Sequence, residues 1–469
     1  MRCTEINRKT HRVTGMTITV YRWNRATIIK KEEKILMKKV LLVATGSMLM
    51  TSAILGITGF AEEAPTQAGV TVEQNADSKT GYTARFVYYD DEAANVKLQG
   101  GFTFYQPGDM YCFGGGRLNA DGDIVDQEHL YTPSTWEKGM CRYGDSGYVE
   151  DMIYDEESGA WMTSLDLPCG SYLYQYVVVD DDGNEKMVTD PANIPWVNEL
   201  GASQTRSQFY VPYDDEKQAS SDDWTFVFPE ENPEDQGSVV WDSYDGIVYE
   251  GCESALQQVM VYLPAHYDEK REEPYKTLYL AHGGGGEEGD WFFQGNAGNV
   301  VDRLAAEGLS EEFVMVAIDI SAGTDEELCK NLTEYTIPYV EKTYNVSTDK
   351  NDRALAGLSK GAKFTYTAHY LLDKTFGYFG VFSVGYPSPD YDVVSAANKN
   401  IAKLYMGAGF ADHTMGASFA EGQIPMVPFA AYCDMNGVEY DGLHVVQGGH
   451  DWFTWPQLLQ DFVQNFLWK

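Results

Sequence analysis

The sequence predicts an all-β sandwich followed by an α/β domain, and three observations support this fold class. Between residues 81 and 193, apolar and aromatic residues alternate with polar ones at a period of two, which is typical of half-buried strands. From residue 277 onward, short continuous apolar segments alternate with helix-length segments instead. An acidic stretch containing Pro, Ser and Gly separates the two patterns.

The chain is expected to begin with segments that lie outside both domains. Residues 1–36 show no fold pattern and precede a plausible start methionine, Met37, so we interpret them as an over-extended translation start. Residues 37–61 combine a basic stub, an apolar run and small residues around the end, which predicts a signal peptide. The alternative is an uncleaved membrane anchor, because the run is long enough to span a bilayer. Residues 62–80 are predicted to be disordered.

The first domain is expected to span residues 81–212. Its predicted strands are separated by Gly, Asp and Asn residues, which favour turns, and lie at residues 83–89, 96–100, 160–165 and 172–179. Residues 213–240 are predicted to form an acidic linker that is partly packed through Trp224, Phe226 and Phe228.

The second domain is expected to span residues 241–469. Its predicted strands are short and apolar, and lie at residues 277–281, 313–318, 353–358, 380–384, 403–406 and 443–446. Helices are expected between them, at residues 326–344, 362–372 and 455–467. Because apolar strands that alternate with helices are buried on both faces, the pattern predicts a parallel sheet covered by helices on both sides.

Composition limits the partners and cofactors of the protein. The net charge is −37 over 469 residues, and the first 61 residues are basic, so the remainder is more acidic still. A surface of this charge repels nucleic acid and anionic membranes, so we expect neither as a partner after signal cleavage. Six of the seven cysteines follow residue 61 without a CxxC pair or zinc-ligand spacing. We therefore expect mostly free, buried thiols, no metal and no cofactor.

The most informative motif is Gly-Leu-Ser-Lys-Gly at residues 357–361. It follows an apolar strand-like segment and precedes a helix-compatible one. In that context Gly-x-Ser-x-Gly indicates a serine on a sharp strand-to-helix turn, with its hydroxyl exposed above a sheet. We therefore predict Ser359 as a nucleophile, which needs a base to accept its proton and an acid to orient that base.

The base is predicted from position along the chain. In an α/β-hydrolase the partners follow in the order serine, acid, histidine. His450 lies in Gly-Gly-His-Asp-Trp, after the last predicted strand and before the last helix, where side chains at the sheet edge reach the nucleophile. The remaining histidines that we considered lie upstream of the motif, on a helix or inside a strand.

Asp412 is the predicted acid, because it follows the strand at 403–406 and a Gly-Ala-Gly turn, between the serine and the histidine in the chain. Asp434 and Asp441 are alternatives that we interpret as surface carboxylates. Asp451 adjoins the histidine, so its side chain should point away from it.

A glycine-rich loop is predicted to bind the negative charge that develops on the attacked carbonyl. His282 is followed by four glycines, directly after the strand at 277–281, where the oxyanion loop of such a fold belongs. We assign one N–H donor to Gly284, with Gly283 or Gly285 as alternatives, and the other to Lys360. His282 is expected to hold this loop rather than to take part in the chemistry.

At these residues the chain resembles the esterase group of α/β-hydrolases that includes feruloyl, acetyl-xylan and enterochelin esterases. The matching stretches agree in order and spacing and extend to the C-terminus, at residues 261–264, 282–286, 290–291, 337–341, 353–361, 448–452 and 455. The resemblance implies an α/β-hydrolase domain that cleaves carboxylic esters through an acyl-enzyme. Lys360, Ala362 and Pro456 depart from the family pattern, and these departures are expected to reshape the acyl pocket.

The first domain looks like the immunoglobulin-like early-set, glycogen-binding-like module that often precedes such esterases. The cues are residues 159–161, 168–174 and 190–193. Trp161 is expected in the core, whereas Trp136 and Trp196 are the candidates for stacking on sugar rings. The resemblance implies a carbohydrate-binding-like domain.

Together these features predict a secreted, extracellular serine esterase that releases feruloyl or acetyl groups from plant polysaccharide. The expected partner is an ester-substituted polysaccharide or oligosaccharide, with Trp291 and Trp452 as substrate-binding residues. One alternative is an enterochelin-type siderophore esterase, which would need basic residues for its anionic substrate. Another is an inactive carbohydrate-binding protein on a hydrolase scaffold.

Overall fold

The computed structural model describes most of the chain from residue 67 onward, together with two short strands near the start. The described residues are 9–13, 16–20, 67–106, 110–111, 117–118, 124–125, 130–144, 147–193, 206–250, 252, 254–387, 391–416 and 423–469. Residues 1–40 and 41–469 form separate compact units. In the first, β1 (Lys9–Val13) pairs with β2 (Met16–Val20), although the sequence pattern predicted no element there. The predicted signal peptide lies outside the described residues, as does Trp196.

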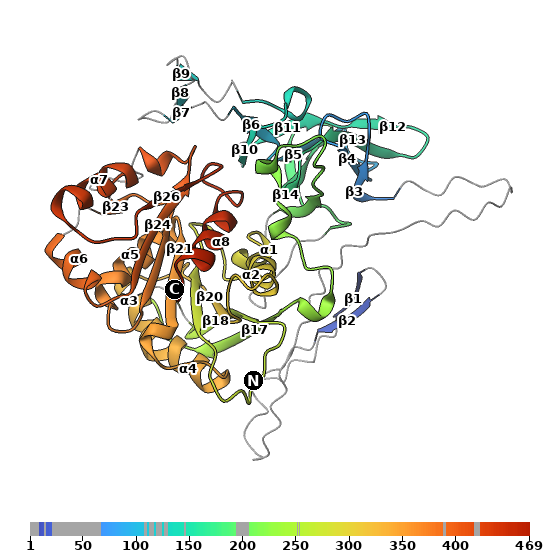
Figure 1. The fold of residues 1–469 in the computed structure, drawn as a ribbon. Helices are drawn as coiled ribbons and strands as arrows, with labels where there is room; N and C mark the ends of the chain where they lie inside the picture. Colours follow the sequence, from blue (N-terminus) through green and yellow to red (C-terminus); the bar gives the residue numbers. More distant parts are fainter. Residues whose placement is uncertain are drawn as a thin grey trace, which may run out of the picture. The chain divides into compact units, whose positions relative to one another are not determined.

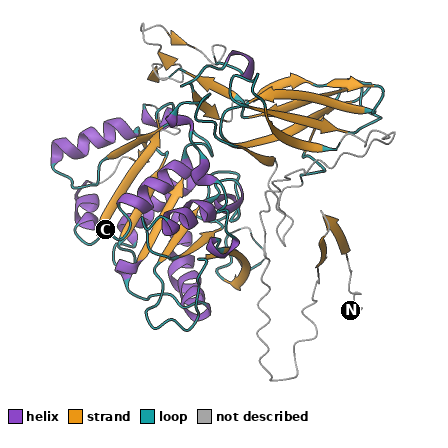
Figure 2. Cartoon of the chain, turned by 45° about the vertical axis from the view of Figure 1, so that its right-hand side comes forward, coloured by secondary structure: helices purple, strands orange, loops and turns teal. Residues whose placement is uncertain are grey.

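The all-β domain is built from two antiparallel sheets (Figures 1 and 2). One has the order β12-β13-β4-β3, with β3 at Gly69–Gln74, β4 at Tyr82–Tyr88, β12 at Ile153–Asp155 and β13 at Ala160–Asp166. The other has the order β11-β5-β14-β15, with β5 at Asn95–Gly100, β11 at Tyr148–Asp151, β14 at Gly170–Val179, β15 at Glu185–Val188 and β16 (Ser207–Val211) paired to β14.

Smaller elements complete this domain. Beside the two sheets, β6 (Thr103–Tyr105) pairs with β10 (Cys141–Gly144), and a 3₁₀ turn occupies Pro133–Thr135. A separate three-stranded sheet joins β7 (Met110–Tyr111), β8 (Arg117–Leu118) and β9 (Ile124–Val125).

The sandwich core corrects two of the sequence-based predictions. Trp136 is 1% exposed and packs among the core aromatics, so it cannot stack on a sugar ring as predicted. Residues 62–80 are not uniformly disordered, because they contain β3, whose Val70 and Val72 pack against the same core. Trp161 is buried in the core, as expected. The predicted sandwich is therefore present, and it begins earlier than residue 81.

The α/β domain is organised around an eight-stranded sheet among the described residues, in the order β17-β18-β20-β19-β21-β22-β24-β26 (Figure 1). β17 (Ser238–Asp245) and β18 (Leu256–Leu263) run antiparallel to their neighbours, whereas the other pairs are parallel. The prediction of a wholly parallel sheet was therefore wrong at this edge. The parallel strands are β19 (Thr277–Ala281), β20 (Val314–Ile318), β21 (Arg353–Leu358), β22 (Tyr378–Phe382), β24 (Lys403–Gly409) and β26 (Leu443–Val446).

Helices follow the parallel strands, and those predicted at 326–344, 362–372 and 455–467 correspond to helical segments of the structure. The helices are α1 (Asp290–Phe293), α2 (Ala297–Ala306), α3 (Asp325–Asn331), α4 (Ile337–Thr343), α5 (Lys360–Leu371), α6 (Tyr391–Asn398), α7 (Met426–Asn436) and α8 (Trp455–Asn465). A π-helical turn at Leu332–Thr336 joins α3 to α4, so the predicted helix at 326–344 is one helical segment with a local widening. Of the helices described, every one is too short or too polar to cross a bilayer.

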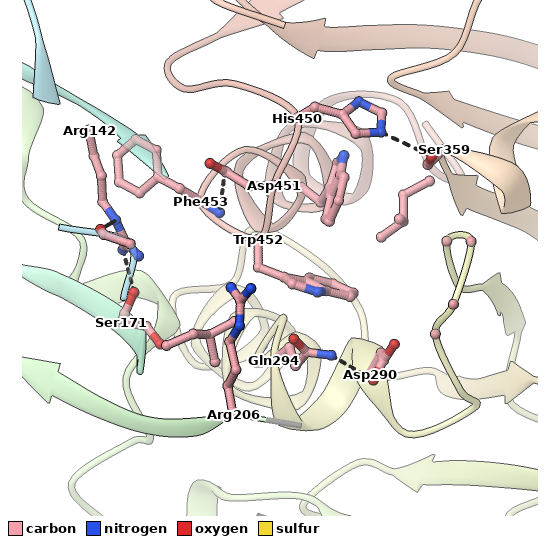
Figure 3. Close-up of a pocket in the computed structure, with 18 residues that line it drawn as sticks. Arg142, Ser171, Arg206, Asp290, Gln294, Ser359, His450, Asp451, Trp452 and Phe453 are labelled. Atoms are coloured by element: carbon pink, nitrogen blue, oxygen red, sulfur yellow. Dashed lines mark hydrogen bonds between the residues drawn. The ribbon is translucent and has the colours of Figure 1, made fainter. Parts of the chain in front are cut away.

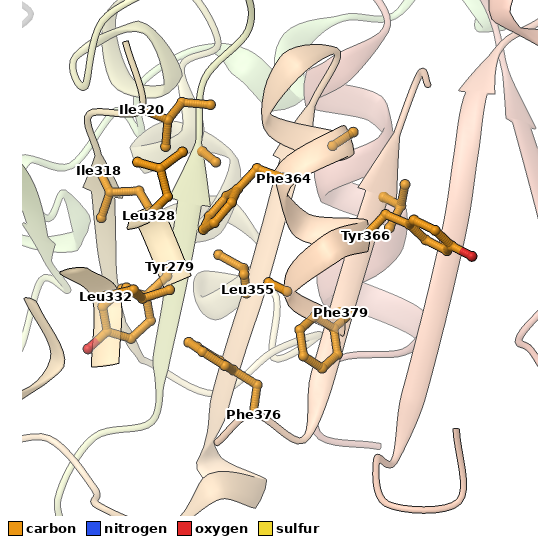
Figure 4. Close-up of a cluster of buried hydrophobic side chains, with 14 of the residues drawn as sticks. Tyr279, Ile318, Ile320, Leu328, Leu332, Leu355, Phe364, Tyr366, Phe376 and Phe379 are labelled. Carbon is orange, nitrogen blue, oxygen red and sulfur yellow. The ribbon is translucent and has the colours of Figure 1, made fainter. Parts of the chain in front are cut away.

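The central sheet buries both of its faces. Along β19, Tyr279 and Ala281 pack against α3, α4 and α5, whereas Leu278 and Leu280 pack on the opposite side against α2 and α8. Figure 4 shows the first of these clusters, in which Phe364 of α5 lies over Leu355 of β21. This alternation positions the carboxyl ends of the parallel strands at one edge of a rigid sheet, where the loops that follow them meet.

The predicted linker is packed against the α/β domain, as expected from Trp224, Phe226 and Phe228. It contains 3₁₀ turns at Ser220–Asp222, Thr225–Val227 and Pro233–Asp235, and it ends in β17. Trp224 is 3% exposed, and its ring stacks on Phe453 with centroids 3.9 Å apart. The segment therefore joins the core of the α/β domain. The described cysteines are free, and all but Cys252 are buried.

Candidate active site

Ser359 lies on the sharp turn that the motif predicted. It has a φ of 52° and a ψ of −114°, between β21 and α5. The flanking glycines are required by close backbone approaches. A Cβ on Gly361 would lie 2.4 Å from the carbonyl oxygen of His282, and a Cβ on Gly357 would lie 2.4 Å from that of Gly361. The helix therefore packs directly against β19, and this packing holds the strained serine at the strand end.

The predicted triad residues meet at the carboxyl edge of the sheet. The Ser359 hydroxyl donates to His450 Nε2 over 3.0 Å, and His450 Nδ1 donates to Asp412, with 3.1 Å to Oδ2 and 3.2 Å to Oδ1. Ser359 follows β21, Asp412 follows β24 and His450 follows β26, so three different strand ends supply the three groups. In this arrangement His450 can accept the serine proton while the carboxylate holds its ring.

Asp412 is fully buried and remains ionised because its surroundings bind the carboxylate. Burial alone would raise its pKa, but the charge of His450 and hydrogen bonds from His450, Ser383 and Thr414 outweigh burial and lower the pKa to about 2. Thr414 donates twice to Oδ1, from its backbone N–H over 2.9 Å and from its hydroxyl over 2.7 Å. The carboxylate is thus fixed in the orientation that presents Oδ2 to His450.

The alternative acids lie elsewhere. Asp441 accepts the backbone N–H of Leu404 and pairs with Lys403, and Asp434 accepts from the hydroxyl of Tyr440. Asp451 Oδ1 accepts the backbone N–H of Phe453 over 2.8 Å, so it stabilises the turn after His450.

Two residues near the triad were missed by the sequence analysis. Ser383 follows β22, is fully buried, and joins Asp412 to Trp455, whose indole N–H donates to its hydroxyl over 3.1 Å. His413 lies beside both partners, with its ring centroid 4.8 Å from that of His450 and its Nδ1 3.8 Å from Asp412 Oδ1. Burial lowers the pKa of His413, which favours its neutral form beside the catalytic base. The sequence did offer one signal for Ser383, because it is a polar residue at the end of a predicted buried strand.

The glycine loop lies beside the nucleophile, as predicted. Gly283, Gly284, Gly285 and Gly286 line the same pocket as Ser359, and a Cβ on Gly284 would lie 4.0 Å from that of Lys360. Lys360 is the first residue of α5, where a backbone N–H has no partner within its helix. Its ammonium is held away from the reacting atoms, because it donates to the carbonyl oxygen of Ile320 over 2.8 Å.

His282 anchors the loop, which agrees with the structural role expected for it. Its Nδ1 donates to the carbonyl oxygen of Gly283 over 2.7 Å, and its Nε2 accepts the backbone N–H of Ile320 over 3.0 Å. The side chain is 1% exposed, so it has no access to a substrate.

A pocket of about 420 Å³ opens over the nucleophile, a volume suited to a small organic ligand (Figure 3). Trp452 lines this pocket, and its role in binding substrate stays a prediction. Trp291 does not line it. That ring is fully buried, donates to the carbonyl oxygen of Ala281 over 3.0 Å and packs edge-on against Trp452, so the prediction that it binds substrate is corrected to a supporting role.

Residues 256–466 match the model of the family described as "Putative esterase". This segment is therefore similar to members of that esterase family. The match confirms the predicted α/β-hydrolase fold and the predicted enzyme class, a carboxylic ester hydrolase, for the esterase domain.

One relative of the chain is named for feruloyl ester cleavage. The chain is 26% identical over 337 residues to an endo-1,4-beta-xylanase/feruloyl esterase of Xylanibacter ruminicola, covering 69% of this chain and 42% of the relative. It therefore spans less than half the length of that relative.

Among solved structures, a ferulic acid esterase of Anaeromyces mucronatus is 21% identical with a TM-score of 0.43, covering 52% of this chain and 94% of that one. The enterobactin esterase of Shigella flexneri is 14% identical with a TM-score of 0.48, covering 84% and 96%.

Proposed function

We propose that the protein is a secreted serine esterase that releases feruloyl or acetyl groups from plant polysaccharide through an acyl-enzyme. The observation that carries the proposal is the continuous hydrogen-bonded chain from Ser359 through His450 to the buried carboxylate of Asp412, at the mouth of a pocket bordered by the glycine loop. Such a chain is the arrangement that activates a hydroxyl for attack on an acyl carbon.

The steps follow from these contacts. Ser359 Oγ attacks the ester carbonyl while His450 Nε2 takes its proton, and the backbone N–H groups of Gly284 and Lys360 bind the oxyanion. The protonated His450 then gives its proton to the leaving alcohol oxygen, which departs and leaves the acyl group on Ser359. A water molecule, deprotonated by the same histidine, attacks the acyl-enzyme and releases the acid. Throughout, Asp412 keeps the ring in place and balances its positive charge.

A named relative and the pocket itself both support the proposed substrate class. The relative from Xylanibacter ruminicola is named as both a xylanase and a feruloyl esterase, which favours an ester on a plant polysaccharide for this chain as well. The pocket volume admits an aromatic acid, and Trp452 offers an apolar surface beside Ser359. The predicted signal peptide and the net charge of −37 support an extracellular protein that does not bind nucleic acid.

The test compares the protein and its Ser359→Ala variant on methyl ferulate, an acetylated xylan and an aryl acetate. We expect turnover of at least one of them, lost by several orders of magnitude in the variant. Turnover of the acetyl esters alone would show that the enzyme cleaves acetyl esters and not feruloyl esters. A folded protein inactive on all three compounds, or activity that survives the substitution, would contradict the proposal.

A second candidate, a siderophore esterase, is favoured by one observation. Arg142 and Arg206 line the pocket, although the chain as a whole is strongly acidic. An anionic siderophore needs such basic groups for binding. Adding a cyclic catecholate triester to the same panel decides between the two, because a siderophore esterase would prefer that compound to methyl ferulate by a large factor in kcat/KM. The inactive carbohydrate-binding alternative is disfavoured by the intact hydrogen bonds from Ser359 to Asp412.

A further inference from the structure

The pocket over Ser359 is built by both domains. Besides the glycine loop and the segment after His450, its lining includes five residues of the β-sandwich, namely Gly101, Arg142, Ser171, Leu173 and Arg206. Figure 3 shows the labelled members of this group across Trp452 from Ser359. We call these five residues the sandwich wall.

The sandwich wall adjoins the segment that follows His450 in the pocket. His450 delivers a proton to the leaving oxygen, so the alcohol lies on the histidine side of the reacting carbonyl. From His450 the chain continues along the pocket through Asp451 and Trp452 to Phe453. The ring of Phe453 lies 5.3 Å from the guanidinium of Arg142, so this path ends at the sandwich wall.

The two arginines of the wall have different surroundings. Arg142 is 8% exposed, donates to the carbonyl oxygens of Gly101 and Ser171, and lies over the ring of Tyr172 at 4.1 Å. It therefore holds the wall together. Arg206 is half-buried and directly precedes β16, and its guanidinium points into the pocket toward Trp452 (Figure 3).

The backbone that carries Arg206 is fixed to both domains. Two residues along, Gln208 Nε2 donates to Ser171 Oγ over 2.6 Å and to the carbonyl oxygen of Gln294, in the esterase domain, over 3.2 Å. Further along the strand, the hydroxyl of Tyr210 bonds the side chain of Asn296. Arg206 directly precedes this strand, whose contacts place it beside the active site, as a specificity-determining residue requires.

We propose that Arg206 binds the glycosyl alcohol of the substrate, so that the β-sandwich supplies the leaving-group subsite of this esterase. The inference deepens the proposed function and rests on it. The guanidinium N–H groups donate to hydroxyl or ring oxygens of the sugar that carries the ester, while the acyl group lies beyond Ser359. The sandwich then selects esters of sugars over esters of simple alcohols.

The experiment uses two substrates that share an acyl group and differ in the alcohol. Methyl ferulate releases methanol, whereas a feruloylated arabinoxylan oligosaccharide releases a sugar; the acetyl pair replaces them if the enzyme is specific for acetyl groups. The variant is Arg206→Gln, and the matched control is Arg85→Gln, which changes an exposed arginine of the same domain that does not line the pocket.

For Arg206→Gln we expect kcat/KM on the oligosaccharide to fall about tenfold to a hundredfold, mainly through KM, as for the loss of a charged hydrogen-bond donor. Turnover of methyl ferulate should stay within about twofold, which also shows that the variant is folded. The kcat/KM of the milder Arg206→Lys on the oligosaccharide should lie between those of Arg206→Gln and the unaltered protein. Arg85→Gln should leave kcat/KM unchanged on both substrates.

Two results would overturn the inference while the proposed function stands: equal losses on both substrates, or no loss on either. If the unaltered protein hydrolyses neither substrate, the proposed function fails and the inference fails with it.

Discussion

Replacing Asp412 by asparagine removes one charge from the triad without changing its shape. The structure indicates how the amide would settle. Because Thr414 donates twice to Oδ1, the amide oxygen would occupy that position and the NH₂ group would face His450 Nδ1, 3.1 Å from the present Oδ2. The ring must then carry its proton on Nε2, where it can no longer accept the proton of Ser359. We expect kcat to fall by about 10³ to 10⁴, the size of effect known for this exchange in serine hydrolases.

The same substitution should also change how the unfolding free energy depends on pH. Lowering the pKa of Asp412 from 3.8 to about 2 stabilises the fold by about 2 kcal/mol at neutral pH. Since the folded pKa is the lower one, this contribution is complete above about pH 4 and is lost as the pH falls toward 2. The difference in unfolding free energy between the unaltered protein and Asp412→Asn, measured with urea, should therefore narrow over this interval.

The assay is single-substrate kinetics on methyl ferulate at neutral pH, with Asp434→Asn as the matched control. The control removes a carboxylate that accepts from Tyr440, outside the triad, and should leave kcat unchanged. A loss below tenfold in Asp412→Asn, or an equal loss in Asp434→Asn, would refute the assignment of Asp412 as the orienting acid.

Three further predictions concern the surroundings of the site. Burial and neighbouring carboxylates raise the pKa of Glu287 to about 7, so ionisation of this carboxyl destabilises the fold as the pH rises from 4.5 through 7. The Glu287→Gln variant should therefore have a higher unfolding free energy than the unaltered protein at pH 8 and the same one at pH 4, as measured with urea. Trp224→Ala should lower the unfolding free energy by about 3–5 kcal/mol, because the buried ring is lost. It should also reduce kcat, because this ring stacks on Phe453, and an unchanged kcat would contradict that expectation. Gly361→Ala should destabilise the fold by about 1–3 kcal/mol or more, seen as a lower Tm, since a Cβ would lie 2.5 Å from the carbonyl oxygen of Ala281.

The features that sequence reasoning predicted are local or follow chain order. The turn at Ser359 requires glycines at fixed offsets, so its signal lies within five residues. His450 and Asp412 could be chosen because parallel strands bring the loops at their carboxyl ends together, and each residue directly follows a recognisable strand. The roles of these residues stay predictions until the variants are measured, but the structure brings them within hydrogen-bond distance.

The features that were missed depend on contacts between distant segments. Trp291 and Trp136 were expected at binding surfaces because an aromatic side chain in a sequence carries no mark of burial, whereas in the structure each is enclosed in a core. Ser383 reaches Asp412 only after β22 and β24 have paired. Arg206 lies more than 150 residues before Ser359, in another domain, and no periodicity links it to the nucleophile.

The contacts between the sandwich and the loop that carries His450 limit how this protein can be re-engineered. Tyr105 of β6 accepts the backbone N–H of Gly448 over 3.2 Å, and Trp224 of the linker covers Phe453. A fusion that exchanges the N-terminal module for another binding domain at residue 241 would discard both supports and leave the histidine loop exposed to solvent. To change the binding specificity of this protein, a new module should therefore be fused before the sandwich, with the sandwich and the α/β domain kept together.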